Sequence, residues 1–259
     1  MSIFDRLTGI PGRISGLALA ACLSAFALAG VSAPAWALGG SAASASPWGL
    51  SSHVVMVLGT RGTVCTGTLL TSRIIITAAH CTVGSKQMAV AYIEGDRPIL
   101  QPVATVARHP GFSKNAAVSV DMALIRLQEP LPARYLPVGL DGGSGAAAIG
   151  ESLTIAGFGL AEEKDYKSAG TLRAASVELL PRMYPRFLRL GIDGDASRLA
   201  ICQGDSGGPV LAGGGAPSLV GVLYAHERNG KKASACGSIA QAVRVAPQRA
   251  WIDRVMAGW

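Results

Sequence analysis

The 259-residue sequence lacks the features of several common protein classes. Its 23 basic residues outnumber its 16 acidic ones, but they form no Lys/Arg run, and aromatic residues are not interleaved with them. The net charge of +7 therefore predicts a solvated basic surface, with no nucleic-acid partner. No CxxC or HxxxH spacing is present, so the sequence predicts no zinc site and no other metal. Internal repeats are also missing.

Long apolar runs are scarce too, and the one near the N-terminus has the flanks of a secretory signal. Arg6 and Arg13 precede the run ISGLALAACLSAFALAGV, and the small-residue segment SAPAWA follows it. This order is typical of a signal peptide, with a possible cut after Ala35 or after Ala37. We expect residues 1–37 to be removed and the protein to be secreted or periplasmic.

Two other interpretations of this leader stay open. An uncleaved signal-anchor would need an apolar stretch of about 20 residues, and this run is shorter and rich in Ala and Gly. The tetrapeptide LAAC resembles a lipoprotein box with Cys22 as the lipidated residue, although the sequence after it stays apolar instead of becoming a polar tether. We expect no stable membrane association.

Cysteine is rare, and its count is informative. Five cysteines are present, and one of them leaves with the leader. The four that remain are Cys65, Cys81, Cys202 and Cys236. An even number in an exported chain predicts two disulfides.

After residue 50 the chain consists of short apolar or alternating stretches separated by Gly, Pro, Ser and Asp. This pattern predicts an all-β sandwich or barrel. The small-residue segment 140–151 divides it into two similar halves. The predicted strands are 53–59, 73–80, 88–94, 102–109, 122–128, 153–159, 171–180, 217–226 and 238–245.

The C-terminus has a different period. From Pro247 onward, the apolar residues Trp251, Ile252, Val255 and Met256 fall on one face of a helix. Proline is tolerated in the first turn of a helix. We expect a C-terminal α-helix that packs its aromatic residues onto a barrel.

Three polar residues have contexts that suggest chemistry. His80 lies in TAAHC after an apolar strand, Asp121 lies in SVDMALIRL at the start of another, and Ser206 lies in the glycine-rich segment CQGDSGGP. A serine hydroxyl becomes nucleophilic when a neighbouring base accepts its proton, and histidine suits that role. A buried carboxylate on the other ring nitrogen fixes the histidine tautomer. The chain order His, Asp, Ser is one of three known for this triad.

These three segments resemble the signature segments of the trypsin/chymotrypsin family of serine proteases, and the chain looks like a bacterial-type secreted member. The segment AGFGL at 156–160 resembles that family's Gly-aromatic-Gly strand. The resemblance implies two antiparallel six-stranded β-barrels with the triad in the cleft between them. We assign 38–145 to the first barrel, and 146–259 to the second barrel plus the helix.

The resemblance assigns a role to each residue of the site. Ser206 would be the nucleophile, His80 the general base and then acid, and Asp121 the residue that orients the histidine. The backbone N–H groups of Gly204 and Ser206 would form the oxyanion hole. The implied disulfides are Cys65–Cys81, beside the histidine, and Cys202–Cys236, across the walls of the specificity pocket. No cofactor is implied. The expected partner is a polypeptide substrate, and the protein is expected to be a monomer.

Asp205 has a separate role in this family, where its counterpart pairs with a newly formed N-terminal amine. The usual Ile-Val-Gly-Gly after a basic cleavage site is replaced here by ALGG at 37–40, with no Lys or Arg directly before it. We therefore hypothesise that removal of the leader itself supplies the amine, on Ala37, Leu38 or a neighbour.

The specificity pocket departs from the trypsin pattern. The position six residues before Ser206 is Ala200, where trypsin-type enzymes have the Asp that attracts Lys or Arg. Ala240 falls where the family often has Gly, which would narrow the pocket. We predict cleavage after small or medium apolar residues. The segment VLYAHE replaces the family's Ser-Trp-Gly, and either Tyr224 or a residue one position away stands for the Trp.

Two alternative functions stay open: a non-catalytic binding protein on a protease scaffold, and an esterase-like acyl hydrolase that uses the same acyl-enzyme chemistry.

Overall fold

The computed structural model describes most of the chain after the leader. The described residues are 38, 43–44, 49–60, 62–85, 87–95, 97–116, 118–140, 148–181, 184–191, 201–213, 217–227 and 236–259.

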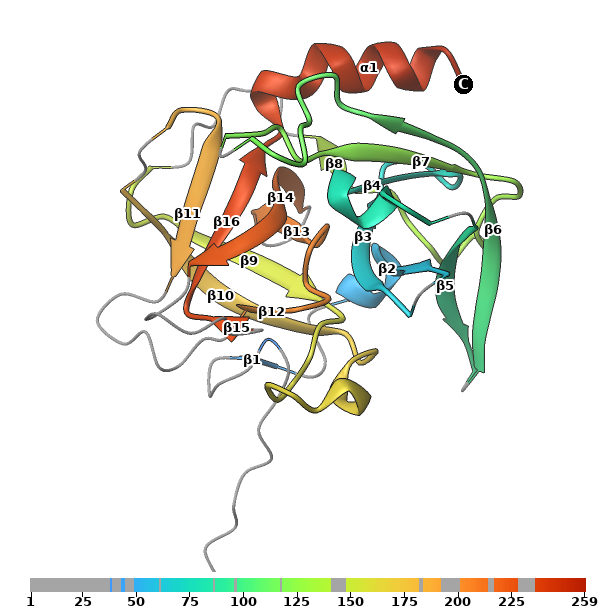
Figure 1. Ribbon diagram of the computed structural model, residues 1–259, viewed down its shortest axis with the longest axis horizontal. Helices are drawn as coiled ribbons and strands as arrows, with labels where there is room; N and C mark the ends of the chain where they lie inside the picture. The colour runs from blue at the N-terminus through green and yellow to red at the C-terminus, as the bar shows by residue number, and fades with distance from the viewer. Residues whose placement is uncertain are drawn as a thin grey trace, which may run out of the picture. The chain divides into compact units, whose positions relative to one another are not determined.

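Six antiparallel strands close the first barrel in the order β2-β3-β4-β7-β6-β5 (Figure 1). They are β2 (Val54–Gly59), β3 (Val64–Leu69), β4 (Ile74–Thr77), β5 (Met88–Glu94), β6 (Arg97–Arg108) and β7 (Ala123–Leu127). Strand β4 reads Ile-Ile-Ile-Thr and is buried along its whole length, because it lies between β3 and β7 with core on both faces.

Six further strands form the second barrel, in the order β9-β10-β11-β16-β14-β13, and β13 returns to pair with β9. They are β9 (Ser152–Gly157), β10 (Arg173–Leu180), β11 (Phe187–Gly191), β13 (Pro209–Ala212), β14 (Ser218–Glu227) and β16 (Ile239–Arg244). The predicted pair of antiparallel six-stranded barrels is therefore confirmed. Figure 1 shows the first barrel in blue to green and the second in yellow to red.

Short strands extend the second barrel. Strand β1 (Ala43–Ser44) pairs with β10, β8 (Gly139–Leu140) runs parallel to β14, and β12 (Ile201–Cys202) pairs with β15 (Cys236–Gly237). Leu38 is fully buried and packs into the apolar cluster of the second barrel, which includes Ile155, Ala175 and Ile201. The start of the described chain is thus held by the second barrel.

Apolar side chains form three core clusters, and one of them joins the two barrels. Each barrel has its own apolar cluster, and a third cluster contains residues of both, such as Ile76 and Leu124 from the first and Leu211 and Val222 from the second. The C-terminal helix α1 (Arg249–Ala257) covers this third cluster, with Ile252 fully buried. The predicted helix is confirmed. Among the described residues, no helix is both long and apolar enough to span a membrane.

Candidate active site

His80 and Asp121 are joined by two hydrogen bonds. His80 lies in a short 3₁₀ helix, Ala79–Thr82, directly after β4, and Asp121 lies two residues before β7. The Nδ1 atom of His80 is 2.7 Å from Oδ2 of Asp121, and the His80 backbone N–H donates to Oδ1 at 2.8 Å. Because β4 and β7 are neighbours in the first barrel, the carboxylate holds both the ring and its backbone.

The two side chains of this pair differ in their exposure to solvent. The Asp121 side chain is 12% exposed and the His80 side chain 39% exposed. The carboxylate is therefore shielded, while the ring reaches the surface. A carboxylate at Nδ1 holds the proton on that nitrogen and leaves Nε2 as an acceptor facing outward.

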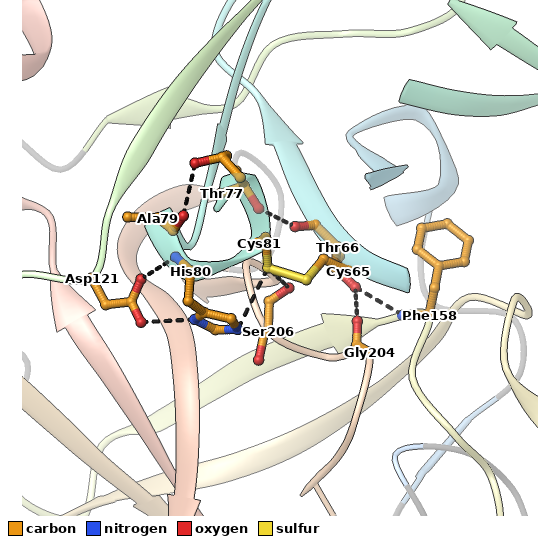
Figure 2. Close-up of a disulfide and its surroundings, with 11 residues drawn as sticks. Cys65, Thr66, Thr77, Ala79, His80, Cys81, Asp121, Phe158, Gly204 and Ser206 are labelled. Atoms are coloured by element: carbon orange, nitrogen blue, oxygen red, sulfur yellow. Dashed lines mark hydrogen bonds and ion pairs between the residues drawn. A yellow bond between two sulfur atoms is a disulfide. The ribbon is translucent and has the colours of Figure 1, made fainter. Parts of the chain in front are cut away.

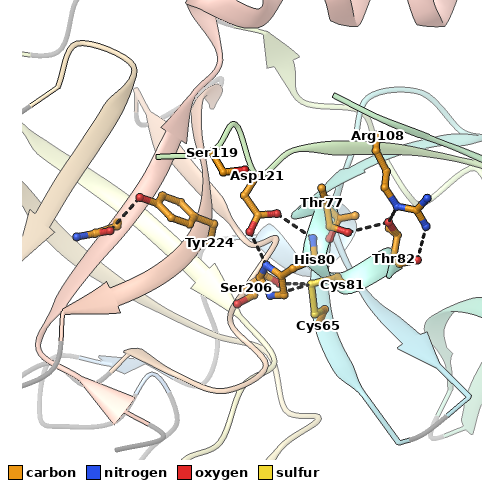
Figure 3. A network of polar contacts seen from close by, with 12 residues as sticks. Cys65, Thr77, His80, Cys81, Thr82, Arg108, Ser119, Asp121, Ser206 and Tyr224 are labelled. Atoms are coloured by element: carbon orange, nitrogen blue, oxygen red, sulfur yellow. Dashed lines mark hydrogen bonds and ion pairs between the residues drawn. A yellow bond between two sulfur atoms is a disulfide. The ribbon is translucent and has the colours of Figure 1, made fainter. Parts of the chain in front are cut away.

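Ser206 reaches the same place from the second barrel. It lies in the turn between β12 and β13, and both close-ups place it beside the His80 ring (Figures 2 and 3). The Ser206 carbonyl accepts a 2.8 Å hydrogen bond from the Thr66 N–H of β3. A sulfur atom of the Cys65–Cys81 disulfide lies 3.6 Å from His80 Nε2 and 3.8 Å from the Ser206 carbonyl oxygen.

Within the described part of the chain, no hydrogen bond joins His80 Nε2 to the Ser206 hydroxyl. Catalytic hydrogen bonds in unliganded sites are often long and tighten only when substrate binds. The three side chains identified from the sequence are thus brought together, with the last contact of the triad still open.

The backbone around Ser206 presents free donors. Gly204 has φ +106°, and the hydroxyl of Thr66 donates to its carbonyl at 2.8 Å. That same hydroxyl accepts the Phe158 N–H at 3.0 Å, so Thr66 ties β3 of the first barrel to two loops of the second (Figure 2). The N–H groups of Gly204 and Ser206 donate to no acceptor among the described residues. They are available to a developing oxyanion.

Two more glycines allow close backbone approach, Gly207 between the two barrels and Gly208 within the second barrel. A Cβ on Gly207 would lie 2.0 Å from the Thr66 carbonyl oxygen, and a Cβ on Gly208 would lie 2.2 Å from the Ala156 carbonyl oxygen. The glycine-rich segment is therefore required by the packing of backbone on backbone around the serine.

Asp205 points away from the triad into the second barrel. It is fully buried, and its two oxygens accept the N–H groups of Gly159 at 2.9 Å and Cys202 at 2.8 Å. Burial raises the pKa of Asp205 to about 7, while these two hydrogen bonds and the charge of Arg173 act in the opposite direction.

Of the remaining predicted site residues, some lie in the described part of the chain and others lie outside it. The Cys202–Cys236 disulfide is formed, as is Cys65–Cys81. Ala240 is fully buried in β16, opposite Leu190 of β11. Ala200 and the ALGG residues other than Leu38 lie outside the described residues, as does the predicted leader 1–37 with Cys22.

Tyr224 occupies the segment that replaces Ser-Trp-Gly. Its ring packs against Phe187 with centroids 5.7 Å apart, and its hydroxyl donates to Gln241 at 2.9 Å (Figure 3). Burial, with the charges of Asp121 and Glu227, raises the pKa of Tyr224 to about 12. The tyrosine is thus a neutral donor fixed beside the triad.

The sequence did not single out Thr66, Arg173 or Gln241. The available signal was weak: Thr66 directly follows a disulfide cysteine, and Arg173 is a charged residue in a mainly apolar strand pattern.

One group of potential metal ligands occurs among the described residues. The ligand atoms of Cys65, His80 and Cys81 lie within 4.8 Å of one another. Because the two sulfurs are bonded to each other, neither is available as a thiolate.

The family model described as Trypsin matches residues 38–252, which is most of the chain. The chain belongs to the trypsin family. This is a family of serine peptidases.

Curated members of the trypsin family are similar to this chain at moderate identity. Trypsin of Saccharopolyspora erythraea is 28% identical, over 61% of this chain and 73% of that protein. Serine protease 1 of Rattus norvegicus is 29% identical, over 62% of this chain and 70% of that protein. Phenoloxidase-activating factor 3 of Holotrichia diomphalia is 27% identical, and the matched region covers 57% of its length.

The fold agrees with a solved trypsin-family structure. Neuropsin, a serine protease expressed in the limbic system of mouse brain, superimposes with a TM-score of 0.67 at 21% identity, covering 83% of this chain and 98% of that one. At this identity the likeness supports the two-barrel fold alone.

Proposed function

We propose that this chain is an exported serine endopeptidase that hydrolyses peptide bonds through Ser206, His80 and Asp121. The single observation that carries the proposal is the convergence of a carboxylate-bound histidine, a serine beside its ring and two backbone N–H groups that have no acceptor in the described part of the chain. His80 and Asp121 come from two separate loops of the first barrel, whereas Ser206 and the two N–H groups share one turn of the second barrel.

The reaction follows from this arrangement in two halves. The Ser206 oxygen attacks the substrate carbonyl carbon while His80 Nε2 accepts the hydroxyl proton, and the negative charge on the carbonyl oxygen is bound by the N–H groups of Gly204 and Ser206. His80 then gives its proton to the departing amine, leaving an acyl-enzyme. Water attacks that ester with His80 again as base, and the serine is regenerated. Asp121 stabilises the protonated ring in both halves.

An open strand edge supports a peptide substrate. Strand β13 pairs with β14 only as far as Val222, and the Leu223 backbone is bonded to residues 207 and 208. Beyond this point β14 continues beside β16, with Ala225 opposite Gln241, and among the described residues no strand pairing is seen on the other side of Ala225. An extended peptide could add to this edge beside Ser206 and place its scissile bond at the hydroxyl.

Substrate preference is proposed from residue types at the pocket. With alanine at positions 200 and 240, no carboxylate is present there to neutralise a buried Lys or Arg side chain. We expect cleavage after small or medium apolar residues. A peptide library cut mainly after Lys or Arg would contradict this preference.

The N-terminus is proposed to complete the site. Removal of the leader near residues 35–38 would release an amine next to Leu38, which is already anchored in the second barrel. That amine would pair with Asp205, so that export and activation are one event. Residues 38–145 and 146–259 would then be the two units of a secreted or periplasmic monomer.

The test is covalent labelling of the serine by a fluorophosphonate probe. The purified protein is compared with Ser206→Ala, and the N-terminus of each is measured by mass spectrometry. Loss of the nucleophile in a comparable triad lowers kcat by roughly 10⁶, so the variant should stay unlabelled. Labelling of the wild type alone, with an N-terminus between 36 and 39, supports the proposal.

Failure of the wild type to label would favour the non-catalytic alternative. If the wild type labels but cleaves esters and no peptide of a diverse library, it would be an acyl hydrolase instead. An N-terminus far from 36–39 in the active protein would disprove activation by leader removal while leaving the triad proposal intact.

A further inference from the structure

Two oppositely charged residues are buried in the second barrel without an ion pair between them. Asp205 has no exposed surface, and Arg173 is 8% exposed. Asp205 precedes the proposed nucleophile by one residue, and Arg173 begins β10. Isolated charges in a protein interior are strongly unfavourable, so each needs compensation.

The strand register places the two groups on the same face of the β9–β10 ribbon. Arg173 is directly opposite Gly157 in this antiparallel pair. A Cβ added to Gly157 would lie 2.3 Å from Oδ1 of Asp205 and 3.0 Å from its carboxyl carbon. Directly opposed residues project to one face of the ribbon, with Cβ atoms about 5 Å apart. The Asp205 carboxylate therefore lies where the side chain of residue 157, opposite Arg173, would be if it were not glycine.

The hydrogen bonding of both groups is incomplete. The Nη1 atom of Arg173 donates to the Thr171 carbonyl at 3.3 Å, while its buried Nε has no hydrogen-bond partner among the described residues. Each Asp205 oxygen accepts one backbone N–H, although an ionised carboxylate has about four acceptor sites. Among the described residues, the Arg173 Nε–H thus has no acceptor, while the neighbouring Asp205 carboxylate accepts fewer hydrogen bonds than it can.

Each charge also acts on the titration of the other. Burial lowers the pKa of Arg173, and the negative charge of Asp205 opposes that change. The positive charge of Arg173 likewise lowers the pKa of Asp205 against the effect of burial. Of the described residues packed around Asp205, from β9, β10 and β12, only Arg173 exerts a charge effect on it.

We propose that Arg173 is the resident counter-cation of Asp205 and a positioning residue for the oxyanion hole. Its charge keeps Asp205 ionised on the N–H groups of Gly159 and Cys202, and thereby fixes the segment that carries the Gly204 and Ser206 donors. The amine from leader removal would add to this charge, whereas Arg173 is present before and after processing. The effect on catalysis rests on the proposed function, but the charge pairing does not.

The first experiment measures unfolding free energy against pH in the Ser206→Ala background, where self-cleavage cannot occur. A carboxyl with a raised pKa destabilises the folded state as it ionises, so stability falls as pH rises from about 4 to about 7. Without Arg173 that pKa rises further. At pH 4, where Asp205 is protonated, the contribution of this carboxyl to the unfolding free energy should be nearly the same in Arg173→Met and in the parent. As pH rises through the pKa of Asp205, Arg173→Met should lose more stability than the parent.

Three comparisons separate the charge from packing. Arg173→Lys, which keeps the charge, should lose much less of this pH-dependent stability. Arg189→Met removes an arginine that pairs with Glu227 at 2.6 Å, so its pH effect should fall in the acid range where glutamate titrates. In an Asp205→Asn chain, Arg173→Met should cause no pH-dependent change. An equal loss at every pH, or equal behaviour of the Lys and Met variants, would overturn the proposal.

The second experiment uses activity in the Ser206 chain. Arg173→Met should lower kcat/KM about tenfold or more, mainly through kcat, and Arg173→Lys should restore most of it. Once Asp205→Asn is present, removal of the arginine should cost no further activity; additive losses would overturn the proposal. If Arg173→Met does not fold alone, it must fold with Asp205→Asn, and failure there would also overturn it. A wild type that never labels disproves the function and leaves the stability result to decide the pairing.

Discussion

At the scale of single residues, glycine is needed for two different physical reasons: a positive φ angle, or a lack of space for a Cβ atom. Gly204 needs both a positive φ and empty space, because a Cβ there would lie 2.7 Å from the Gly159 Cα. Gly150 also has a positive φ, +84°, but a Cβ there would meet nothing within 4 Å. Both positions thus need a positive φ, but only Gly204 also needs the space that a Cβ would fill.

This contrast gives a prediction for the oxyanion site. Gly204→Ala must displace either the Gly159 backbone or the Gly204 donor, so labelling rate and kcat/KM should fall by about 10²–10³, as for the loss of one oxyanion donor. Gly150→Ala carries a similar backbone strain away from the site and should keep near-normal activity. Equal activities of the two purified variants would show that the position of Gly204 is not critical.

At the scale of elements, strand β3 carries a polar link between the barrels. Thr66 is fully buried, and its hydroxyl accepts a hydrogen bond from the Phe158 N–H and donates one to the Gly204 carbonyl. Thr68, two positions along on the same strand, is equally buried, but within the described residues its hydroxyl has no hydrogen-bond partner. Two threonines of one strand thus differ in what their hydroxyls do.

We predict opposite results for the two threonines. Thr66→Val leaves two buried polar groups unpaired, each worth about 1–3 kcal/mol, so stability and labelling rate should both fall. Thr66→Ser keeps the hydroxyl and should retain most of both. Thr68→Val should be neutral or slightly stabilising, because it removes a polar group that has no partner. Denaturant unfolding of the three variants tests this, and equal losses at both positions would refute the assignment.

At the scale of the whole molecule, one disulfide fastens each barrel near the site. Cys65–Cys81 closes a separation of 16 residues in the first barrel, and Cys202–Cys236 closes 34 residues in the second. In the chain-entropy account, a crosslink stabilises by restricting the unfolded chain, and slightly more for a longer loop.

The expected cost of removing either disulfide is about 2–4 kcal/mol of unfolding free energy, with Cys202–Cys236 at the upper end. Paired Cys→Ala variants in the Ser206→Ala background allow this to be measured by denaturant unfolding. A change below about 0.5 kcal/mol for either pair would mean that the packed barrels alone restrict that loop.

The sequence by itself determined the family, the two-barrel class, the C-terminal helix and the three residues of the proposed triad. The family, the two barrels and the triad roles follow from the resemblance of short motifs to a known family, and the helix follows from local apolar periodicity; the chain carries both signals in contiguous segments. The barrel strands β3, β11 and β13 were not predicted. Thr and Gly in β3 and Arg in β11 interrupt the apolar pattern, and β13 is only four residues long. Gly67 in β3 is there for a tertiary reason: a Cβ would lie 2.6 Å from an Ile75 methyl group.

Only the tertiary structure decided which distant residues serve the site. The bond from Thr66 to Gly204 spans 138 positions, and Arg173 faces Asp205 only because β9 and β10 pair in one register. Such contacts leave no local periodicity, since each depends on where two closed barrels meet. Chemistry that a family motif encodes was thus readable from the chain, whereas the groups that hold this chemistry in position emerged from packing.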